Sequence, residues 1–200
     1  MKNQTQKRAF YVLTGCIAAL ALCIAAALAL LCRTPAAQDV SIPGTRGTIY
    51  ATVQLPGKLA RSGDMPLAVL CHGFTGSRAG DGHFAPLAQD LAAQGIATVR
   101  LDFPGCGDST EPFTAYTLSN MADDVESAIL YMQSTYGTGP TALVGHSMGG
   151  ETIRMLAQLL ENGDADERNA SRGGDISPLF TGECRHWIES ICLLYTSDAA

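Results

Sequence analysis

Apolar and polar positions divide this chain of 200 residues into an uncharged N-terminal segment and a body in which short apolar runs recur. The uncharged segment, Ala9–Cys32, is 24 residues long and follows three basic residues, Lys2, Lys7 and Arg8. At about 1.5 Å per residue, a helix of this length exceeds the roughly 30 Å hydrocarbon core of a membrane. The pattern predicts a transmembrane helix over residues 9–32, with residues 1–8 as a basic cytoplasmic N-terminus.

The length of this segment bears on whether it is retained or removed. The apolar part of a secretory signal peptide usually holds about 7–15 residues. We therefore predict a retained signal anchor, with a cleaved signal peptide as the alternative. Arg33–Thr45 contains two prolines and few apolar residues, and we interpret residues 33–47 as a tether. This arrangement predicts a single-pass membrane protein whose folded body lies outside the cytoplasm.

Strand and helix patterns alternate along the body of the chain. Short apolar or alternating runs predict four strands: Thr48–Leu55, Pro66–Cys71, Ile96–Phe103 and Thr141–Val144. The first of these ends at Pro56-Gly57 and is typical of an edge strand in a hairpin. Apolar residues at helical spacing predict helices over 84–92, 118–132 and 153–160, with the carboxylates at 123, 124 and 126 on the solvent side. This order predicts an α/β fold, a mostly parallel sheet with helices on both faces.

The alternation of strand and helix patterns does not continue after residue 160. Glu161–Arg185 is rich in Gly, Asp, Asn and Ser and predicts a long surface excursion, after which Trp187–Ile191 could begin another strand. We therefore set the partial domain at residues 48–191. The last nine residues, 192–200, look like an in-frame translation of a transposon-end sequencing adapter, and we exclude them from the fold. A natural strand over Ile188–Tyr195 is the alternative.

Charge and cysteine usage exclude several classes of protein. The net charge of the chain is -6. Residues 33–200 contain all 19 acidic residues, the first of which is Asp39, but only 10 of the basic residues. Such a body repels nucleic acid, which is bound through basic groups. Three of the seven cysteines fall in the apolar segment, and the others show no paired spacing. We expect no metal site, no disulfide framework and no cofactor.

The candidate chemistry begins at a Gly-x-Ser-x-Gly pattern, Gly145–Gly149, placed between a predicted strand and a predicted helix. This setting is typical of a nucleophile on a tight turn, which makes Ser147 the candidate catalytic residue. The backbone N–H of Met148 then opens the helix and is one candidate oxyanion donor. The loop His72–Gly76 follows a buried strand, and the backbone N–H of Phe74 is the second candidate. A glycine-rich turn that merely ends the strand is the alternative interpretation.

Residues 66–160 resemble the first half of an α/β-hydrolase. The resemblance rests on the His-Gly-Phe-Thr-Gly loop, on the segment Arg100–Ser109 and on the Gly-His-Ser-Met-Gly-Gly turn. Within that superfamily the chain is similar to cinnamoyl and feruloyl esterases and to monoacylglycerol lipase-like hydrolases. The resemblance implies hydrolysis of small-molecule carboxylic esters through an acyl-enzyme on Ser147. The loop lacks the His-Gly-Gly-Pro-Gly of related peptidases, and Cys106 replaces a more usual histidine.

The resemblance also implies an Asp or Glu and then a His after the serine. His186 is the only histidine after Ser147, but it precedes the strand that would carry the acid. We therefore expect the acid and base beyond residue 191, in a C-terminally truncated α/β-hydrolase domain whose present fragment is inactive. A non-catalytic binding protein on a hydrolase scaffold is the alternative function, and a peptidase or lipase of the same superfamily is another. The sequence does not indicate an oligomeric state.

Overall fold

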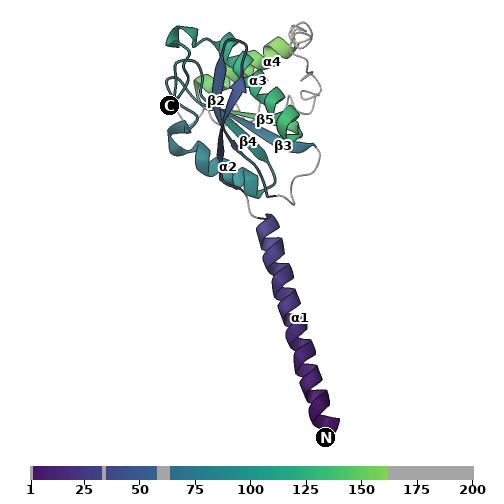
Figure 1. The fold of residues 1–200 in the computed structure, drawn as a ribbon. Coiled ribbons are helices and arrows are strands. Elements are labelled where there is room, and N and C mark those ends of the chain that lie inside the picture. The colour runs from purple at the N-terminus through teal and green to yellow at the C-terminus, as the bar shows by residue number, and fades with distance from the viewer. Residues whose placement is uncertain (1, 33–34, 58–63, 162–200) are drawn as a thin grey trace.

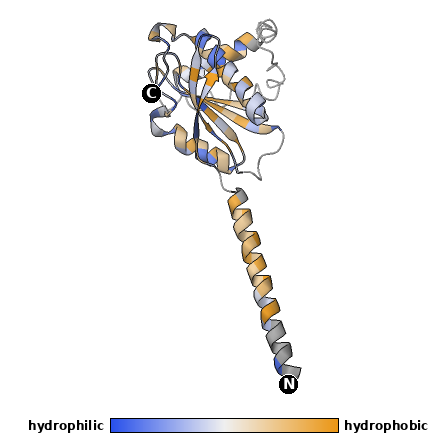
Figure 2. Cartoon of the chain, viewed as in Figure 1, coloured by the Kyte–Doolittle hydropathy of each residue, from blue (hydrophilic) through white to orange (hydrophobic). Residues whose placement is uncertain are grey.

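The computed structural model of the chain describes residues 2–32, 35–57 and 64–161. Its first element is the helix α1, Lys2–Cys32, which projects away from the folded body in Figure 1. The part Tyr11–Leu30 is long and apolar enough to cross a membrane, and none of it is buried against the body. Figure 2 shows apolar residues on the visible side along most of this helix. The predicted helix is therefore present, and it begins seven residues earlier than the apolar run.

The body is built on one five-stranded sheet with the order β1-β2-β4-β3-β5. The strands are β1 Gln38–Pro43, β2 Thr48–Gln54, β3 Met65–Cys71, β4 Ala97–Leu101 and β5 Thr138–Gly145. β3 lies between β4 and β5 and is parallel to both. β1 and β2 form a hairpin, and β2 is antiparallel to β4. The predicted parallel centre is confirmed, and the hairpin adds an antiparallel flank.

The tether predicted for residues 33–47 is wrong for residues 38–43, which form β1. Val40 and Ile42 alternate with polar neighbours, and Ile42 is fully buried opposite Ile49. A short turn in which the Gly44 N–H donates to the Gly47 carbonyl (2.8 Å) closes the hairpin. Because β1 takes the outer position, β2 is an inner strand and not the edge strand that its sequence predicted.

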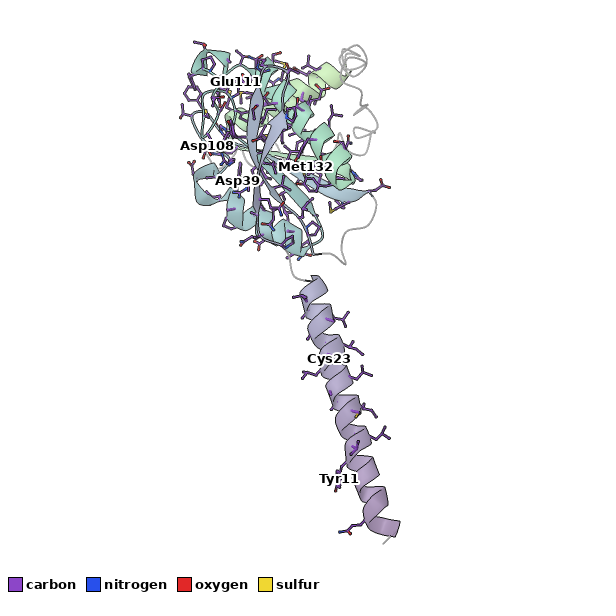
Figure 3. The ribbon with its side chains drawn as sticks, viewed as in Figure 1. Tyr11, Cys23, Asp39, Asp108, Glu111 and Met132 are labelled. Carbon is purple, nitrogen blue, oxygen red and sulfur yellow. The ribbon has the colours of Figure 1, made fainter. Side chains whose placement is uncertain are left out.

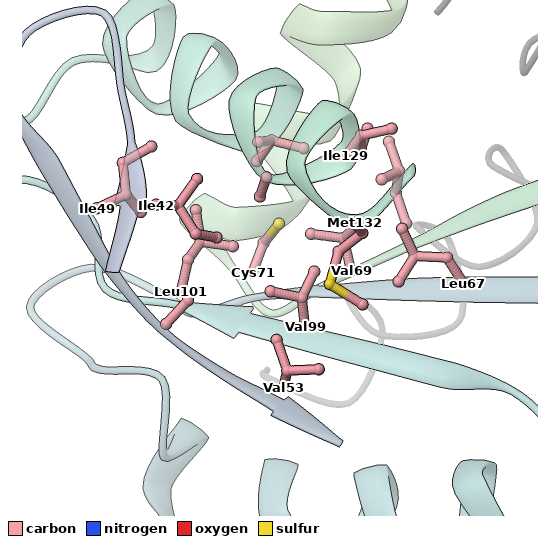
Figure 4. Close-up of a cluster of buried hydrophobic side chains, with 14 of the residues drawn as sticks. Ile42, Ile49, Val53, Leu67, Val69, Cys71, Val99, Leu101, Ile129 and Met132 are labelled. Carbon is pink, nitrogen blue, oxygen red and sulfur yellow. The ribbon is translucent and has the colours of Figure 1, made fainter. Parts of the chain in front are cut away.

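Helices cover both faces of the sheet, as predicted (Figure 1). α2, Phe84–Ala93, packs on one face, and α3, Leu118–Tyr136, and α4, Met148–Glu161, pack on the other. The side chains of β3 alternate between the two layers. Leu67, Val69 and Cys71 join the larger cluster with α3, part of which Figure 4 shows, while Ala68 and Leu70 pack with α2.

The prediction that the carboxylates of α3 face solvent is wrong at two positions. Asp124 and Glu126 are 1% and 2% exposed. The guanidinium of Arg46, from the β1–β2 turn, contacts Asp124 Oδ1 at 2.6 Å and Asp123 Oδ2 at 3.5 Å. The same guanidinium also contacts Glu111 at 3.1 Å. A cation supplied by a distant turn therefore compensates the buried charge of Asp124.

Several predictions concern residues outside the described ranges. These are the excursion after residue 161, the strand over 187–191, His186, and the adapter-like segment 192–200. They stay predictions.

Candidate active site

Three loops meet at one edge of the sheet. β3, β4 and β5 run parallel, so their carboxyl ends lie at the same edge. The chain leaves β3 towards α2 on one face and leaves β4 towards α3 on the other, so the connections diverge beside the end of β3. Ligands bind at such switch points in open α/β sheets. The candidate site residues 74, 147 and 148 all lie on or beside these loops.

Ser147 occupies the turn between β5 and α4. Its side chain is exposed, and its φ of 51° lies in the left-handed region that non-glycine residues rarely adopt. Small neighbours make this turn possible. A Cβ added at Gly145 would lie 2.5 Å from the backbone of Gly149 and Gly150, and one added at Gly149 would overlap the Cys71 carbonyl. The strand and helix therefore pack beneath Ser147 at a distance that only glycine permits at these two positions.

The backbone N–H groups of Phe74 and Met148 have no acceptor within the described residues. In the first turn of α4, the N–H groups of Gly149 and Gly150 donate to the carbonyls of His146 and Ser147. The N–H of Met148 is left available at the positive end of the helix dipole. Both candidate donors are thus unoccupied in the part of the chain that is described.

The loop that carries Phe74 lies against the serine turn. A Cβ added at Gly73 would be 3.3 Å from Ser147 Cβ and 3.0 Å from His146 Nδ1. The His146 N–H donates to the Cys71 carbonyl at 3.0 Å and joins the ends of β5 and β3. The two predicted halves of the site are therefore adjacent, although they are separated by about 70 residues in the sequence.

His72 is held inside the loop and is not available as a base. It is 1% exposed, and both ring nitrogens are engaged. Nε2 accepts the Phe103 N–H at 3.1 Å, so Nδ1 carries the proton and donates to the Gly73 carbonyl at 2.7 Å. Burial lowers the pKa of His72 below 6.5, against smaller opposing effects of the Gly73 hydrogen bond and of Asp102 and Asp81. The ring is therefore neutral near pH 7.

Asp102 ties the loops after β3 and β4 together. Its buried carboxylate accepts the backbone N–H groups of Arg78 (2.7 Å) and Asp108 (3.0 Å) and pairs with the Arg78 guanidinium. The same guanidinium contacts Asp108 at 2.6 Å and Asp39 at 3.9 Å, and Figure 3 labels both of these acidic residues. This network fixes the loop that carries Cys106, whose thiol pKa is raised by burial.

An aromatic cluster covers the loop next to the serine turn. Tyr116 stacks on Phe113 (5.1 Å between ring centroids) and meets Phe74 edge to face (5.6 Å). Phe74 and Phe113 are 57% and 46% exposed. Sequence reasoning missed Tyr116, because its contact with the Gly73 loop spans 43 positions in the chain.

Within the described residues, no acid and base are found beside Ser147. The described histidines are His72, His83 and His146, and no hydrogen bond to the Ser147 hydroxyl is formed within the described ranges. In residues 2–32, 35–57 and 64–161, no group of three or more His, Cys, Asp or Glu side chains is arranged to hold a metal ion.

Two family profiles match the chain. One, described as the alpha/beta hydrolase fold, covers residues 66–164, and a second, described as a lipase-like C-terminal domain, covers residues 132–200. Residues 66–164 therefore match the model of the α/β-hydrolase fold.

Two curated relatives match a short part of the chain. Lipase 2 from Staphylococcus aureus is 50% identical over 56 residues, which are 27% of this chain and 8% of that lipase. Lipase 1 from Staphylococcus aureus strain Mu50 is 54% identical over 56 residues, again 27% and 8%. The matched part is thus a small fraction of the length of these lipases.

The solved structures share the fold. Est1E from Butyrivibrio proteoclasticus, solved with ferulic acid bound, has a TM-score of 0.53 and 24% identity over 62% of this chain and 48% of its own. A serine hydrolase without a lid from Xanthomonas campestris has a TM-score of 0.53 and 23% identity over 62% and 57%. A cold-adapted esterase from an Arctic metagenomic library has a TM-score of 0.51 and 20% identity over 62% and 58%.

Proposed function

We propose that this protein is a serine hydrolase that cleaves carboxylic esters through an acyl-enzyme on Ser147. The observation that carries the proposal is the exposed Ser147 at φ 51°, between two glycines that admit no side chain. The lipases among the relatives agree with this class of reaction. We also propose that the backbone N–H groups of Phe74 and Met148 form the oxyanion hole, because neither has an acceptor within the described residues.

In the proposed reaction, Ser147 Oγ attacks the ester carbonyl carbon while its proton passes to a general base. The negative charge that develops on the carbonyl oxygen is met by the two backbone N–H groups. The bond to the alcohol then breaks, and the alcohol leaves with the proton from the base. Water attacks the acyl-enzyme in the same way and restores Ser147.

The base and the acid that orients it belong, in this proposal, outside the described residues. His72 is excluded by its two ring hydrogen bonds and its burial. The family order places an acid and then a histidine after the serine. A reading frame of the complete gene that lacks these two residues would favour the non-catalytic binding protein.

The test uses the protein encoded by the complete gene. We expect hydrolysis of p-nitrophenyl acetate and covalent labelling by a fluorophosphonate, with the label found on Ser147 by mass spectrometry. Ser147→Ala should lower kcat by about 10⁴-fold or more, since the nucleophile is removed. Ser134→Ala, the same change at an exposed serine of α3, is the matched control. Full activity in Ser147→Ala would overturn the proposal.

We further propose that α1 anchors the protein in a membrane, with its N-terminus in the cytoplasm and the hydrolase domain on the other side. The support is the apolar helix over Tyr11–Leu30 and the basic residues that precede it. A cleaved signal sequence near an N-terminus has the same length and composition. N-terminal sequencing of the mature protein distinguishes the two, because an anchor is retained and a signal peptide is removed.

A further inference from the structure

The Gly73 carbonyl accepts three hydrogen bonds, although a carbonyl oxygen has two lone pairs. The donors are His72 Nδ1 at 2.7 Å, the Gly76 N–H at 3.1 Å and the Tyr116 hydroxyl at 3.3 Å. Two of these donors belong to the same short loop. Tyr116 comes from the segment between η3, Phe113–Ala115, and α3, and is the donor from outside the loop.

The Gly73 carbonyl belongs to the same peptide group as the Phe74 N–H. A trans peptide is planar, and its N–H points opposite to its C=O. Donors that hold the carbonyl therefore also fix the direction of the N–H. Hydrogen bonds to the carbonyl further polarise the peptide and strengthen its N–H as a donor. The Phe74 N–H is consequently oriented by residues that do not touch it.

We propose that Tyr116 is a positioning residue of the oxyanion hole, because its hydroxyl holds the Gly73–Phe74 peptide with the Phe74 N–H available to the oxyanion at Ser147. The inference rests on the function proposed above. It also accounts for the aromatic cluster: contacts of the Tyr116 ring with Phe113, Phe74 and Phe103 hold the hydroxyl in place. The hydroxyl is protonated at every ordinary assay pH, since burial and the nearby Cys106 raise the pKa of Tyr116 to about 12.

Tyr116→Phe removes the hydroxyl and keeps the ring contacts. In the protein from the complete gene, we expect kcat/KM for p-nitrophenyl acetate to fall about tenfold, since one well-placed hydrogen bond is lost. The inhibition constant of a trifluoromethyl ketone, which forms a tetrahedral adduct with a serine, should rise by the same factor. The thermal midpoint should stay unchanged. Tyr131→Phe, the same change at a half-buried tyrosine of α3, is the control and should leave all three values unaltered.

Two results would overturn the inference: an unchanged kcat/KM, or a loss of kcat/KM with no change in the inhibition constant of the ketone. A second variant replaces Tyr116 by 3,5-difluorotyrosine, which keeps the hydroxyl and makes it a stronger donor. Measured below the pKa of that phenol, the amide proton of Phe74 in the ketone adduct should resonate further downfield than in the wild type. An unmoved resonance also contradicts the inference. Loss of activity in Ser147→Ala with normal activity in Tyr116→Phe would refute this role and leave the proposed function standing.

Discussion

At the scale of single residues, Gly149 sets how closely α4 approaches β3. A Cβ at this position would overlap the carbonyl of Cys71, which belongs to the rigid end of a central strand. The next residue, Gly150, is different, because an added Cβ would meet nothing closer than 3.9 Å. Two adjacent glycines of one helix therefore have opposite tolerance for a side chain.

We expect Gly149→Ala to lower the free energy of unfolding by about 3 kcal/mol or more, because backbone must move to admit the methyl group. Gly150→Ala should raise it by about 0.5–1 kcal/mol, since alanine favours the helix. Chemical denaturation of both variants measures the difference. Equal effects of the two substitutions would show that the close contact with Cys71 is absent.

His72 adds a pH dependence at the same scale. The unfolded chain binds a proton at this residue near pH 6.5, and the folded chain binds it only at lower pH, because burial lowers the pKa. Unfolding therefore takes up a proton between these two pKa values. The free energy of unfolding should fall as the pH drops below about 6.5, by at most about 1.4 kcal/mol per pH unit, with no contribution of His72 above that pH.

The measurement is denaturation of the wild type and of His72→Gln between pH 5 and 8 (about the range in which histidine titrates). His72→Gln should lose this part of the slope, while His83→Gln, at an exposed position, should keep it. A slope that survives in His72→Gln would assign the effect to another group.

At the scale of elements, Arg46 joins the β1–β2 hairpin to α3. Its guanidinium contacts a carboxylate of α3, Asp124, whose side chain is 2% exposed, and donates to the Asn120 carbonyl at 3.1 Å. Breaking a buried ion pair lowers the free energy of unfolding more than breaking an exposed pair does, because a desolvated charge is left without its partner. The hairpin and the helix therefore depend on each other for stability.

Arg46→Met should lower the free energy of unfolding by about 2–4 kcal/mol, as Asp124 loses its guanidinium partner. Arg154→Met is the matched control, since Arg154 pairs with Glu151 at 64% and 47% side-chain exposure and its loss should cost less than about 1 kcal/mol. Similar costs for both variants would mean that Asp124 does not depend on Arg46.

At the scale of the whole molecule, the apolar span of α1 is not buried against the folded body. Tyr11 and Cys23, which Figure 3 labels on α1, are both exposed, and the span Tyr11–Leu30 is not buried. The body therefore does not cover this apolar span, which is consistent with the membrane anchor proposed above.

Deletion of residues 1–34 should move the protein from the membrane fraction to the soluble fraction and leave the thermal midpoint of the body unchanged. Carbonate-washed membranes of cells that express the full chain provide the comparison. A full-length protein that is already soluble, with an intact N-terminus, would contradict the proposed anchor.

Local sequence patterns predicted much of the fold and of the candidate site. The runs at 66–71 and 141–144 predicted β3 and β5 because strands that are buried on both faces are apolar throughout. The spacing of Gly145, Ser147 and Gly149 was informative because a tight strand-to-helix turn imposes small residues on its immediate neighbours. Each of these constraints involves residues that are close together in the chain. The sequence by itself therefore determined the succession of the central strands and helices along the chain and the position of the serine turn.

Only the tertiary structure decided what depends on partners far apart in the chain. β1 has a weak pattern and forms because β2 offers it a hydrogen-bonded edge. Asp124 appeared to be a solvent residue because helical periodicity does not reveal a cation 78 positions away. The hydroxyl of Tyr116 reaches the Gly73 carbonyl, 43 positions away in the chain, only because the fold places the loop after β3 beside it. Such contacts leave no local signal, because the residues that make them meet only after the sheet has assembled.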